Sequence, residues 1–235
     1  MEGGGSVIAA IIPARGGSRG IKDKNLTDLC GKPLLAWSIE QAKACPEVDA
    51  VFVTSDSDRI LEVARAHGGG AIVRPAALAT DTASSEDALL HAIDEIEKDH
   101  GAIDLVVFLQ ATSPLRKPFD ISAAIAAVRS QNADSHFSSV RMDDVCLWTA
   151  SNGSPIDSVT YNYRQRGRRQ DRQPYLLENG SIYVFKPEVL RRERNRLGGR
   201  IVVSTMEPWQ AFEIDSIEDL PLCEYYMQRH LLSHQ

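Results

Sequence analysis

The sequence contains no apolar run that approaches the roughly 20 residues needed to cross a membrane. It is also poor in cysteine, and its four thiols, at Cys30, Cys45, Cys146 and Cys223, are far apart and form no C-x-x-C pair. This spacing argues against a structural metal site or a disulfide framework, so we expect free, reduced thiols. The first residues are neither basic nor followed by a signal-peptide cleavage pattern, and we therefore expect a cytoplasmic protein.

There is no overall excess of positive charge. The net charge of −6 at pH 7 gives no general reason to bind nucleic acid or an anionic membrane, and we predict neither as a partner. Hydrophobic residues make up 43% and charged residues 25% of the chain, which is ordinary for a globular protein. We expect one domain over residues 1–235, because a chain of this length can bury a substantial core.

Two familiar phosphate-binding motifs are missing. The only Gly-Lys pair, Gly31-Lys32, has Leu26 where a P-loop needs its first glycine and Pro33 where it needs serine or threonine. The dinucleotide fingerprint G-x-G-x-x-G does not occur either. The chain is therefore neither a recognisable P-loop NTPase nor a recognisable NAD-binding domain.

What the chain does have is a loop rich in glycine and positive charge directly after an apolar run. Residues Val7–Ile12 have the length and residue types of a buried strand. The following loop offers backbone amides, a hydroxyl and cationic side chains, at Arg15, Gly16, Gly17, Ser18, Arg19, Gly20, Lys22, Lys24 and Asn25. Glycines allow N–H groups to turn toward an anion, and arginine supplies fixed charge. We predict a polyphosphate cradle; the alternative is an ordinary basic surface loop.

Strand-like and helix-like segments alternate along the first 140 residues. The strand-like segments are Val7–Ile12, Ala50–Thr54, Ala71–Val73, Asp104–Leu109 and Ser135–Arg141. The helix-like segments are Asp58–His67, Ser85–His100 and Ile121–Ser130. This alternation predicts an α/β fold with a mostly parallel, Rossmann-like sheet flanked by helices.

The pattern changes at residue 142. Residues 142–178 are polar, rich in arginine and without helical periodicity, and an insertion of this length favours a functional or oligomer-forming role. Strands are predicted again at Ser181–Phe185, Ile201–Ser204 and Ala211–Ile214. Helices are predicted at Glu188–Arg196 and Ser216–Leu232.

Other polar residues stand where a ligand could meet them. Gln110 follows the strand-like run Asp104–Leu109, and ligands of open α/β sheets bind at the carboxyl ends of strands. Glu213 and Asp215 alternate in a strand-like segment, which places both carboxylates on one face. Two such hard anionic ligands suit Mg²⁺, whereas an isolated pair of this kind is usually two exposed acids at a strand end.

A basic run surrounds Arg168 and Arg169. Taken alone it would suggest a nuclear import signal or an RNA-binding patch, but it also contains an acid and two glutamines. A guanidinium binds a carboxylate through two parallel hydrogen bonds, so Arg169 is a candidate clamp for a carboxylate substrate. Tyr183 is predicted to line the same pocket, with burial in the sheet as the rival explanation.

Five segments resemble, in order, the motifs of the cytidylyltransferases that make CMP-sialic acids. They are the loop residues Arg15, Ser18, Arg19, Lys24 and Asn25, then Arg74–Ser85, Leu109–Arg116, Arg168–Asp171 with Asn179–Tyr183, and Glu213–Asp215. Ala111 replaces a frequent proline of the family, and Glu213 replaces its first aspartate, which makes Asp215 the safer metal ligand. The resemblance covers roughly residues 7 to 232 and implies a nucleotidyltransferase fold with a dimerisation insertion at 142–178.

The resemblance also implies roles for individual residues. The catalytic residues would be Arg15, Lys24 and Asp215, with Mg²⁺ as cofactor on Asp215 and Glu213. The nucleotide-binding residues would be Gly16, Gly17, Ser18, Asn25, Arg74 and Ala83. The residues for the sugar acid would be Ser85, Gln110, Arg169 and Tyr183.

The expected reaction is therefore cytidylyl transfer from CTP to a nonulosonic (sialic-type) acid in a homodimeric enzyme. The alternatives are a related acid (legionaminic, pseudaminic or deaminated sialic acid, or the eight-carbon Kdo) or a catalytically silent nucleotide-binding homologue. The R-R-Q-D and N-G-S segments argue against Kdo, and intact Arg15, Lys24 and Asp215 argue against a silent homologue.

Overall fold

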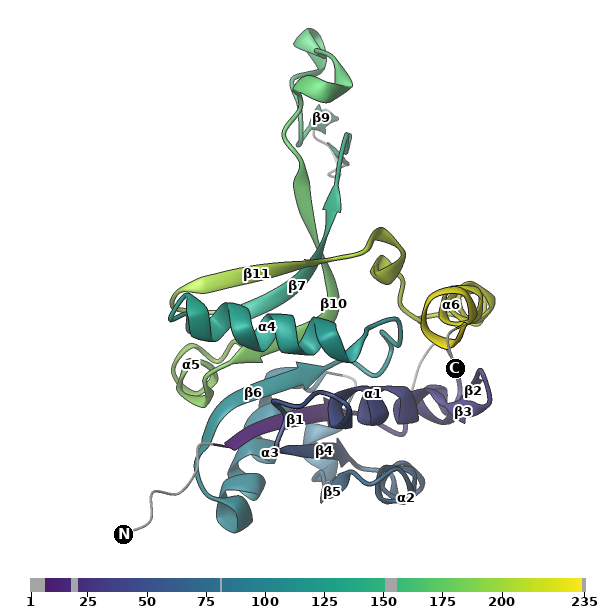
Figure 1. Cartoon of the computed structure of the whole chain (residues 1–235), viewed down its shortest axis with the longest axis vertical. Helices are drawn as coiled ribbons and strands as arrows, with labels where there is room; N and C mark the ends of the chain where they lie inside the picture. The colour runs from purple at the N-terminus through teal and green to yellow at the C-terminus, as the bar shows by residue number, and fades with distance from the viewer. Residues whose placement is uncertain (1–6, 18–20, 81, 151–155, 234–235) are drawn as a thin grey trace.

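The computed structural model describes residues 7–17, 21–80, 82–150 and 156–233. Within these residues a seven-stranded sheet has the order β11-β7-β10-β6-β1-β4-β5 (Figure 1). Its strands are β1 (Val7–Pro13), β4 (Ala50–Ser55), β5 (Gly70–Val73), β6 (Ile103–Leu109), β7 (Ser135–Met142), β10 (Tyr175–Phe185) and β11 (Ile201–Met206). Strand β10 runs antiparallel to both of its neighbours, and the other pairs are parallel. The predicted mostly parallel α/β sheet is confirmed.

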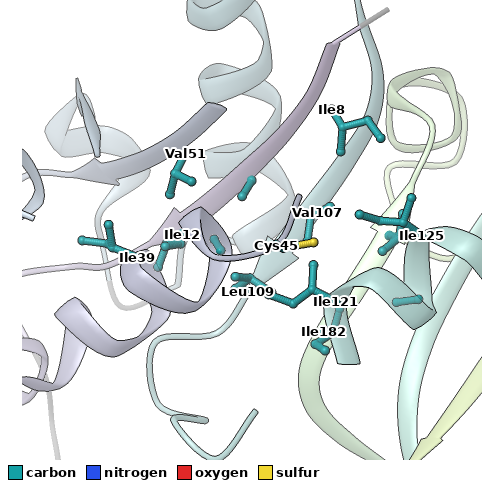
Figure 2. Close-up of a cluster of buried hydrophobic side chains, with 14 of the residues drawn as sticks. Ile8, Ile12, Ile39, Cys45, Val51, Val107, Leu109, Ile121, Ile125 and Ile182 are labelled. Carbon is teal, nitrogen blue, oxygen red and sulfur yellow. The ribbon is translucent and has the colours of Figure 1, made fainter. Parts of the chain in front are cut away.

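Helices cover both faces of this sheet. They are α1 (Leu34–Lys43), α2 (Asp58–Ala66), α3 (Ser85–His100), α4 (Pro118–Ser130) and α5 (Pro187–Glu193), whereas α6 (Asp219–Met227) packs in a separate cluster with Leu29, Leu34 and Trp37. Alternate residues of β1 point to opposite faces, so Ile8 and Ile12 join the core under α1, α2 and α4, whereas Ile11 joins the core under α3 and α5. Figure 2 shows the first of these cores. Because β1 is buried on both faces, it reads as a continuous apolar run rather than an alternating one.

Local signals set the limits of the best-predicted helix. The hydroxyl of Ser84 accepts a hydrogen bond from the Asp87 amide at 3.1 Å and caps the first turn of α3. Gly101 ends the helix with a φ of +80°, a conformation that glycine adopts without strain. The helix therefore begins and ends where the sequence predicts.

In the last quarter of the chain one predicted strand is wrong and two predicted helices are shorter than expected: Glu188–Arg196 ends at Glu193, and Ser216–Leu232 begins at Asp219. Ala211–Ile214 is not a strand: Pro208–Ala211 forms a 3-10 helix (η5), and the next residues lack regular structure. The buried Gln210 amide donates to Leu115 O at 2.8 Å, a contact across the fold that local alternation could not reveal. The closing helix begins at Asp219 and continues as a π-helical turn over Gln228–Leu232.

Strands β7 and β10 continue beyond the sheet as a two-stranded arm that projects from one end of the molecule (Figure 1). Strand β10 begins at Tyr175, earlier than predicted, and pairs with β7 from there. The arm carries the short strands β8 (Trp148–Thr149) and β9 (Asp157–Ser158) and the 3-10 helices η3 (Tyr163–Gln165) and η4 (Arg169–Asp171). Its exposed apolar side chains include Leu147, Trp148, Ile156, Val159, Tyr163, Tyr175, Leu176 and Leu177. Among the described residues, no helix is both long and apolar enough to span a membrane.

Candidate active site

A cavity of about 380 Å³ opens where β1 and β6 end, at the carboxyl edge of the parallel strands. Residues that the sequence predicts for the site line it from five separate segments of the chain. They are Arg15, Lys24, Asn25, Ser85, Gln110 and Asp215. Phe108 and Thr112 complete its wall beside β6. The fold thus brings together residues that are up to 200 positions apart in sequence.

The loop after β1 is held by hydrogen bonds to its neighbours. The Gly16 amide donates to Asp56 Oδ1 at 2.9 Å, and Asn25 Nδ2 donates to Arg15 O at 3.1 Å. A Cβ at residue 16 would lie 3.0 Å from the Cβ of Ser57, so glycine is needed there for close approach. Because its N–H is already engaged, Gly16 shapes the loop rather than offering a free amide to an anion. Gly17 is exposed.

Lys24 connects the two ends of the chain at this cavity. Its Nζ donates to Ile214 O and to Asp215 Oδ1, both at 3.0 Å, across a sequence separation of 191 residues for the carboxylate. The Lys24 side chain is only 13% exposed, so its ammonium group is held by these contacts rather than by solvent. The cationic loop and the acidic C-terminal segment therefore meet at one place.

Asp215 lies in a turn that other acids and amides shape. Asp219 Oδ2 accepts hydrogen bonds from the amides of Asp215 and Ser216 at 2.9 and 2.7 Å, and these lower the pKa of Asp219. Asp219 thus stabilises the turn and the start of α6. On the other side, Ile214 N donates to Thr112 O at 2.8 Å and fixes the segment against the end of β6.

Glu213 and Asp215 are neighbours although the segment is not a strand. Partial burial raises the pKa of Glu213, and the nearby Asp215 carboxylate raises it further, while Lys24 opposes the shift. Two carboxyl groups crowded in this way form a site that a divalent cation would suit, because it relieves their repulsion. Among the described residues there is no group of three or more His, Cys, Asp and Glu side chains placed to hold a metal.

Gln110 is fixed by the turn at Gly180. Its Nε2 donates to Gly180 O at 2.8 Å, which leaves the amide oxygen to accept. Gly180 has a φ of +67°, and a Cβ there would lie 2.4 Å from Gln110 Nε2. Behind the pair, the buried guanidinium of Arg116 donates to Gln110 O and, at 3.1 Å, to Ser181 Oγ. In the sequence, Arg116 was named only as the last residue of the segment Leu109–Arg116, so its role was missed.

Several predicted site residues do not line the cavity. Arg74 is buried behind the loop, where Nη2 donates to Thr54 O at 2.6 Å and burial lowers its pKa. Ala83 is half-buried, and its amide donates to Thr80 O. Ser18 lies outside the described residues.

The two remaining sugar-acid candidates do not line the cavity either, although the Tyr183 ring stacks on Phe108, which does. Tyr183 is buried in the sheet, and its hydroxyl donates to Glu178 Oε1 at 2.5 Å, so burial, the rival explanation, describes it. Arg169 lies in η4 on the arm, where its side chain is 73% exposed and sits 3.7 Å from Asp144. The cavity of the same chain therefore does not contain the predicted carboxylate clamp.

One cationic side chain beside the cavity, Arg196, belongs to no motif and was not predicted from the sequence. Arg196, in the loop after α5, donates from Nη2 to Ser85 Oγ at 2.6 Å and from Nε to Glu86 Oε1 at 2.9 Å. Its guanidinium lies over the rings of Phe108 and Tyr183 at 4.7 and 4.8 Å. Because several arginines lie close together in this part of the sequence, nothing in the sequence marks Arg196 as a residue of the site.

Comparisons with known proteins agree with this architecture. The family model described as cytidylyltransferase matches residues 9–233. The chain is 34% identical over 224 residues to N-acylneuraminate cytidylyltransferase of Oncorhynchus mykiss, covering 94% of this chain and 50% of that protein. It is 33% identical over 214 residues to N-acylneuraminate cytidylyltransferase of Streptococcus agalactiae, covering 89% of this chain and 50% of that protein. The chain thus spans about half the length of these curated relatives.

Solved structures share the fold at lower identity. A CMP:2-keto-3-deoxy-manno-octonic acid synthetase complexed with CTP superposes with a TM-score of 0.72 at 20% identity, over 96% of this chain and 100% of that one. The 4-diphosphocytidyl-2C-methyl-D-erythritol synthase of Anaerococcus prevotii gives a TM-score of 0.67 at 14% identity, over 95% and 97% of the two chains. These likenesses confirm the nucleotidyltransferase fold.

Proposed function

This chain belongs to the cytidylyltransferase family, and from that premise we propose that it transfers the cytidylyl group of CTP to a nonulosonic acid of the sialic type. The anomeric hydroxyl of the acid attacks the α-phosphorus, the bond to the β-phosphate oxygen breaks, and diphosphate leaves. The relatives named as N-acylneuraminate cytidylyltransferases, at 33 and 34% identity, support this choice of acid.

The observation that carries the proposal is the contact between Lys24 and Asp215 at the cavity, 3.0 Å apart. In-line displacement at phosphorus depends mainly on position and on neutralisation of charge. Arg15 and Lys24 supply positive charge from the loop after β1, on the side where the triphosphate would lie. Gln110 also lines the cavity, where its fixed amide oxygen can accept from the sugar acid.

Glu213 and Asp215 are the residues that would hold Mg²⁺. When bound there, the ion would neutralise phosphate oxygens and favour ionisation of a coordinated hydroxyl. The Lys24 ammonium holds the Asp215 carboxylate at the cavity.

We further propose a homodimer in the cytoplasm, in which the arm reaches the partner's cavity. The arm exposes apolar side chains, including Trp148 at 45% and Leu176 at 49%, which a second copy of the chain would cover. In this arrangement Arg169 of one protomer would meet the substrate carboxylate in the cavity of the other.

The test of the reaction is diphosphate release with CTP, Mg²⁺ and a panel of acids: N-acetylneuraminic, legionaminic, pseudaminic and deaminated sialic acids, and Kdo. We expect turnover with at least one nine-carbon acid. Arg15→Ala and Asp215→Ala should each lower turnover by about 10²-fold, the scale of a lost transition-state contact. Arg59→Ala and Asp104→Ala, exposed controls outside the cavity, should retain it. Binding of CTP without diphosphate release for every acid would refute the proposal.

The test of the arm uses subunit complementation. Arg169→Ala should raise the KM for the acid and leave the KM for CTP unchanged. Co-expression of Arg169→Ala with Asp215→Ala chains should restore activity, because one hybrid site combines an intact cavity with an intact arm. Restoration would fail if Arg169 acted within its own chain or if the protein were a monomer in sedimentation.

A further inference from the structure

Strand β10 contains a β-bulge where the arm meets the sheet. Its register against β7 shifts between the pairs Glu178–Ser139 and Tyr183–Phe137. Across this interval β10 advances five residues while β7 advances two, so β10 accommodates three extra residues. A bulge interrupts the regular ladder of hydrogen bonds, and other groups must then bond the backbone of the bulged strand. We call residues 179–182 the β10 bulge.

The β10 bulge borders the cavity. The carbonyl of Gly180 accepts a hydrogen bond from Gln110 Nε2 at 2.8 Å, and Gln110 lines the cavity. A Cβ on Gly180 would clash with this amide and would lie 3.9 Å from Glu213 Oε2. The position of this one glycine therefore determines where the Gln110 amide is held.

The hydroxyl of Ser138, on β7 opposite the bulge, takes the place of the interrupted ladder. It accepts a hydrogen bond from the Ile182 amide at 2.8 Å and donates to Asn179 Oδ1 at 2.6 Å. A serine hydroxyl has one proton and two lone pairs, so it can make these two bonds at the same time. Both ends of the bulge are thus attached to one side chain, which is buried and does not line the cavity.

The Asn179 side chain anchors the bulge on its other side. Its Nδ2 donates to Gln210 O at 3.1 Å, which fixes the orientation of the amide and directs Oδ1 toward Ser138. Gln210 is itself held, because its Nε2 donates to Leu115 O at 2.8 Å. The amide of Asn179 therefore cannot turn to replace a lost Ser138 hydroxyl without breaking a buried hydrogen bond.

We infer that Ser138 is a positioning residue of the active site, which acts through the β10 bulge to fix the direction of the Gln110 amide. This inference rests on the proposed function and deepens it, because it assigns the placement of a cavity side chain to a residue behind the cavity. The effect is independent of which substrate Gln110 contacts, since Ser138 acts only on the position of the amide.

The experiment measures diphosphate release by Ser138→Ala with the best acid of the panel. Without the hydroxyl, the Ile182 amide loses its acceptor, and Asn179 Oδ1 retains the longer bond from Ser181 N at 3.4 Å. We expect kcat/KM to fall about tenfold, the size of one misplaced hydrogen bond. The substrate whose KM rises should be the one whose KM rises in Gln110→Ala, and the KM of the other substrate should stay unchanged.

A double-mutant cycle separates positioning from a general loss of stability. If Ser138 acts through Gln110, the addition of Ser138→Ala to Gln110→Ala should lower kcat/KM by less than about twofold further. The alanine variant is first shown to be folded by circular dichroism. If it is not folded, Ser138→Cys takes its place in the cycle, because a thiol fills the same space with only a weak donor.

The matched control is Ser139→Ala. Ser139 is the next residue of β7 and is equally buried, but its hydroxyl donates to Ser204 O at 3.1 Å, outside the bulge. This variant also loses one buried hydrogen bond, so its thermal stability should fall by a similar amount. Its kcat/KM should remain that of the wild type.

Three results would overturn the inference while the proposed reaction stands. The first is a folded Ser138 variant with the kcat/KM of the wild type, and the second is a full additional loss in the Gln110→Ala background. The third is an equal loss in Ser139→Ala, which would assign the effect to the stability of β7. Absence of diphosphate release by the wild type with every acid would instead count against the proposed function, so the two failures are distinguishable.

Discussion

Arg116 is a buried cation that forms no ion pair within the described part of the chain, although the Asp120 carboxylate favours its charge. Its side chain is fully buried, and its hydrogen bonds within the described structure go to neutral acceptors. They run to Ser38 Oγ at 2.7 Å, Gln41 Oε1 at 3.2 Å, Ser181 Oγ at 3.1 Å and Gln110 O. Burial lowers the pKa of Arg116 to about 9, which leaves it charged at neutral pH. One side chain thus joins α1, the end of β6 and β10.

Substitution of Arg116 by Met should destabilise the fold by about 3 kcal/mol. The hydroxyls of Ser38 and Ser181 can rotate to new partners, but Gln41 Oε1 loses its donor and Gln110 O keeps only the Ser113 amide at 3.2 Å. Gln41 cannot turn its amide without breaking the bond from Nε2 to Pro114 O at 2.8 Å. The orphaned Gln41 oxygen costs about 1–3 kcal/mol, and the lost charge-assisted bond to Gln110 O costs about 1.5–3 kcal/mol. The relief of a buried charge offsets part of this cost.

The measurement is urea unfolding followed by tryptophan fluorescence at pH 7, since the buried Trp37 next to this cluster reports on the fold. The control is Arg129→Met, because Arg129 makes only an exposed ion pair with Asp104 at 3.7 Å, and we expect a change below about 0.5 kcal/mol. A loss of less than about 1 kcal/mol for the Arg116 variant would show that the acceptors find other partners. The assignment of Arg116 as a structural clamp would then be wrong.

Three further predictions concern other parts of the fold. Burial lowers the pKa of His136 from 6.5 to about 4. Between these pH values the unfolded chain therefore binds a proton that the folded chain does not. The free energy of unfolding should decrease as the pH is lowered through this window, by about 2 kcal/mol at pH 5. Thermal unfolding of His136→Gln should lack this loss. Gly180→Ala should lower activity at least tenfold in the diphosphate-release assay, because the new Cβ displaces the Gln110 amide. Thiol labelling of the native protein should modify the exposed Cys146 first and spare Cys223, whose pKa burial raises to about 12.

Sequence patterns located the elements whose signals are local. The helix Ser85–His100 was predicted to the residue because an N-cap, an apolar stripe and a glycine stop agree. Helix α1 was missed for the opposite reason. Leu34 to Ile39 are all buried, so the helix shows no polar face and no amphipathic period. The strand predicted at Ala211–Ile214 was wrong. Polar and apolar residues alternate there as they do in a strand, but the buried hydrogen bond from Gln210 to Leu115 O determines the local structure.

The site was predictable where its residues belong to motifs and not where they act through space. Arg15, Lys24, Gln110 and Asp215 were named from patterns, and the fold places them around one cavity. Arg196 is held beside that cavity by its salt bridge with Glu86 and by the rings of Phe108 and Tyr183. No local sequence pattern indicates such contacts.

Strand β10 gives the arm a direct mechanical connection to the cavity. It pairs with β7 along the arm from Tyr175, passes the cavity at Gly180, whose carbonyl holds Gln110, and then enters the sheet beside β6. A partner that held the arm would therefore act on the same strand that positions the Gln110 amide. If the homodimer forms as proposed, dissociation should raise the KM for the acid even in Arg169→Ala, which has no clamp to lose, because the arm no longer fixes the position of Gly180 and with it the Gln110 amide. Dilution of the Arg169→Ala enzyme through its dimer dissociation range, with KM measured for both substrates, would separate this effect from the simple loss of a clamp.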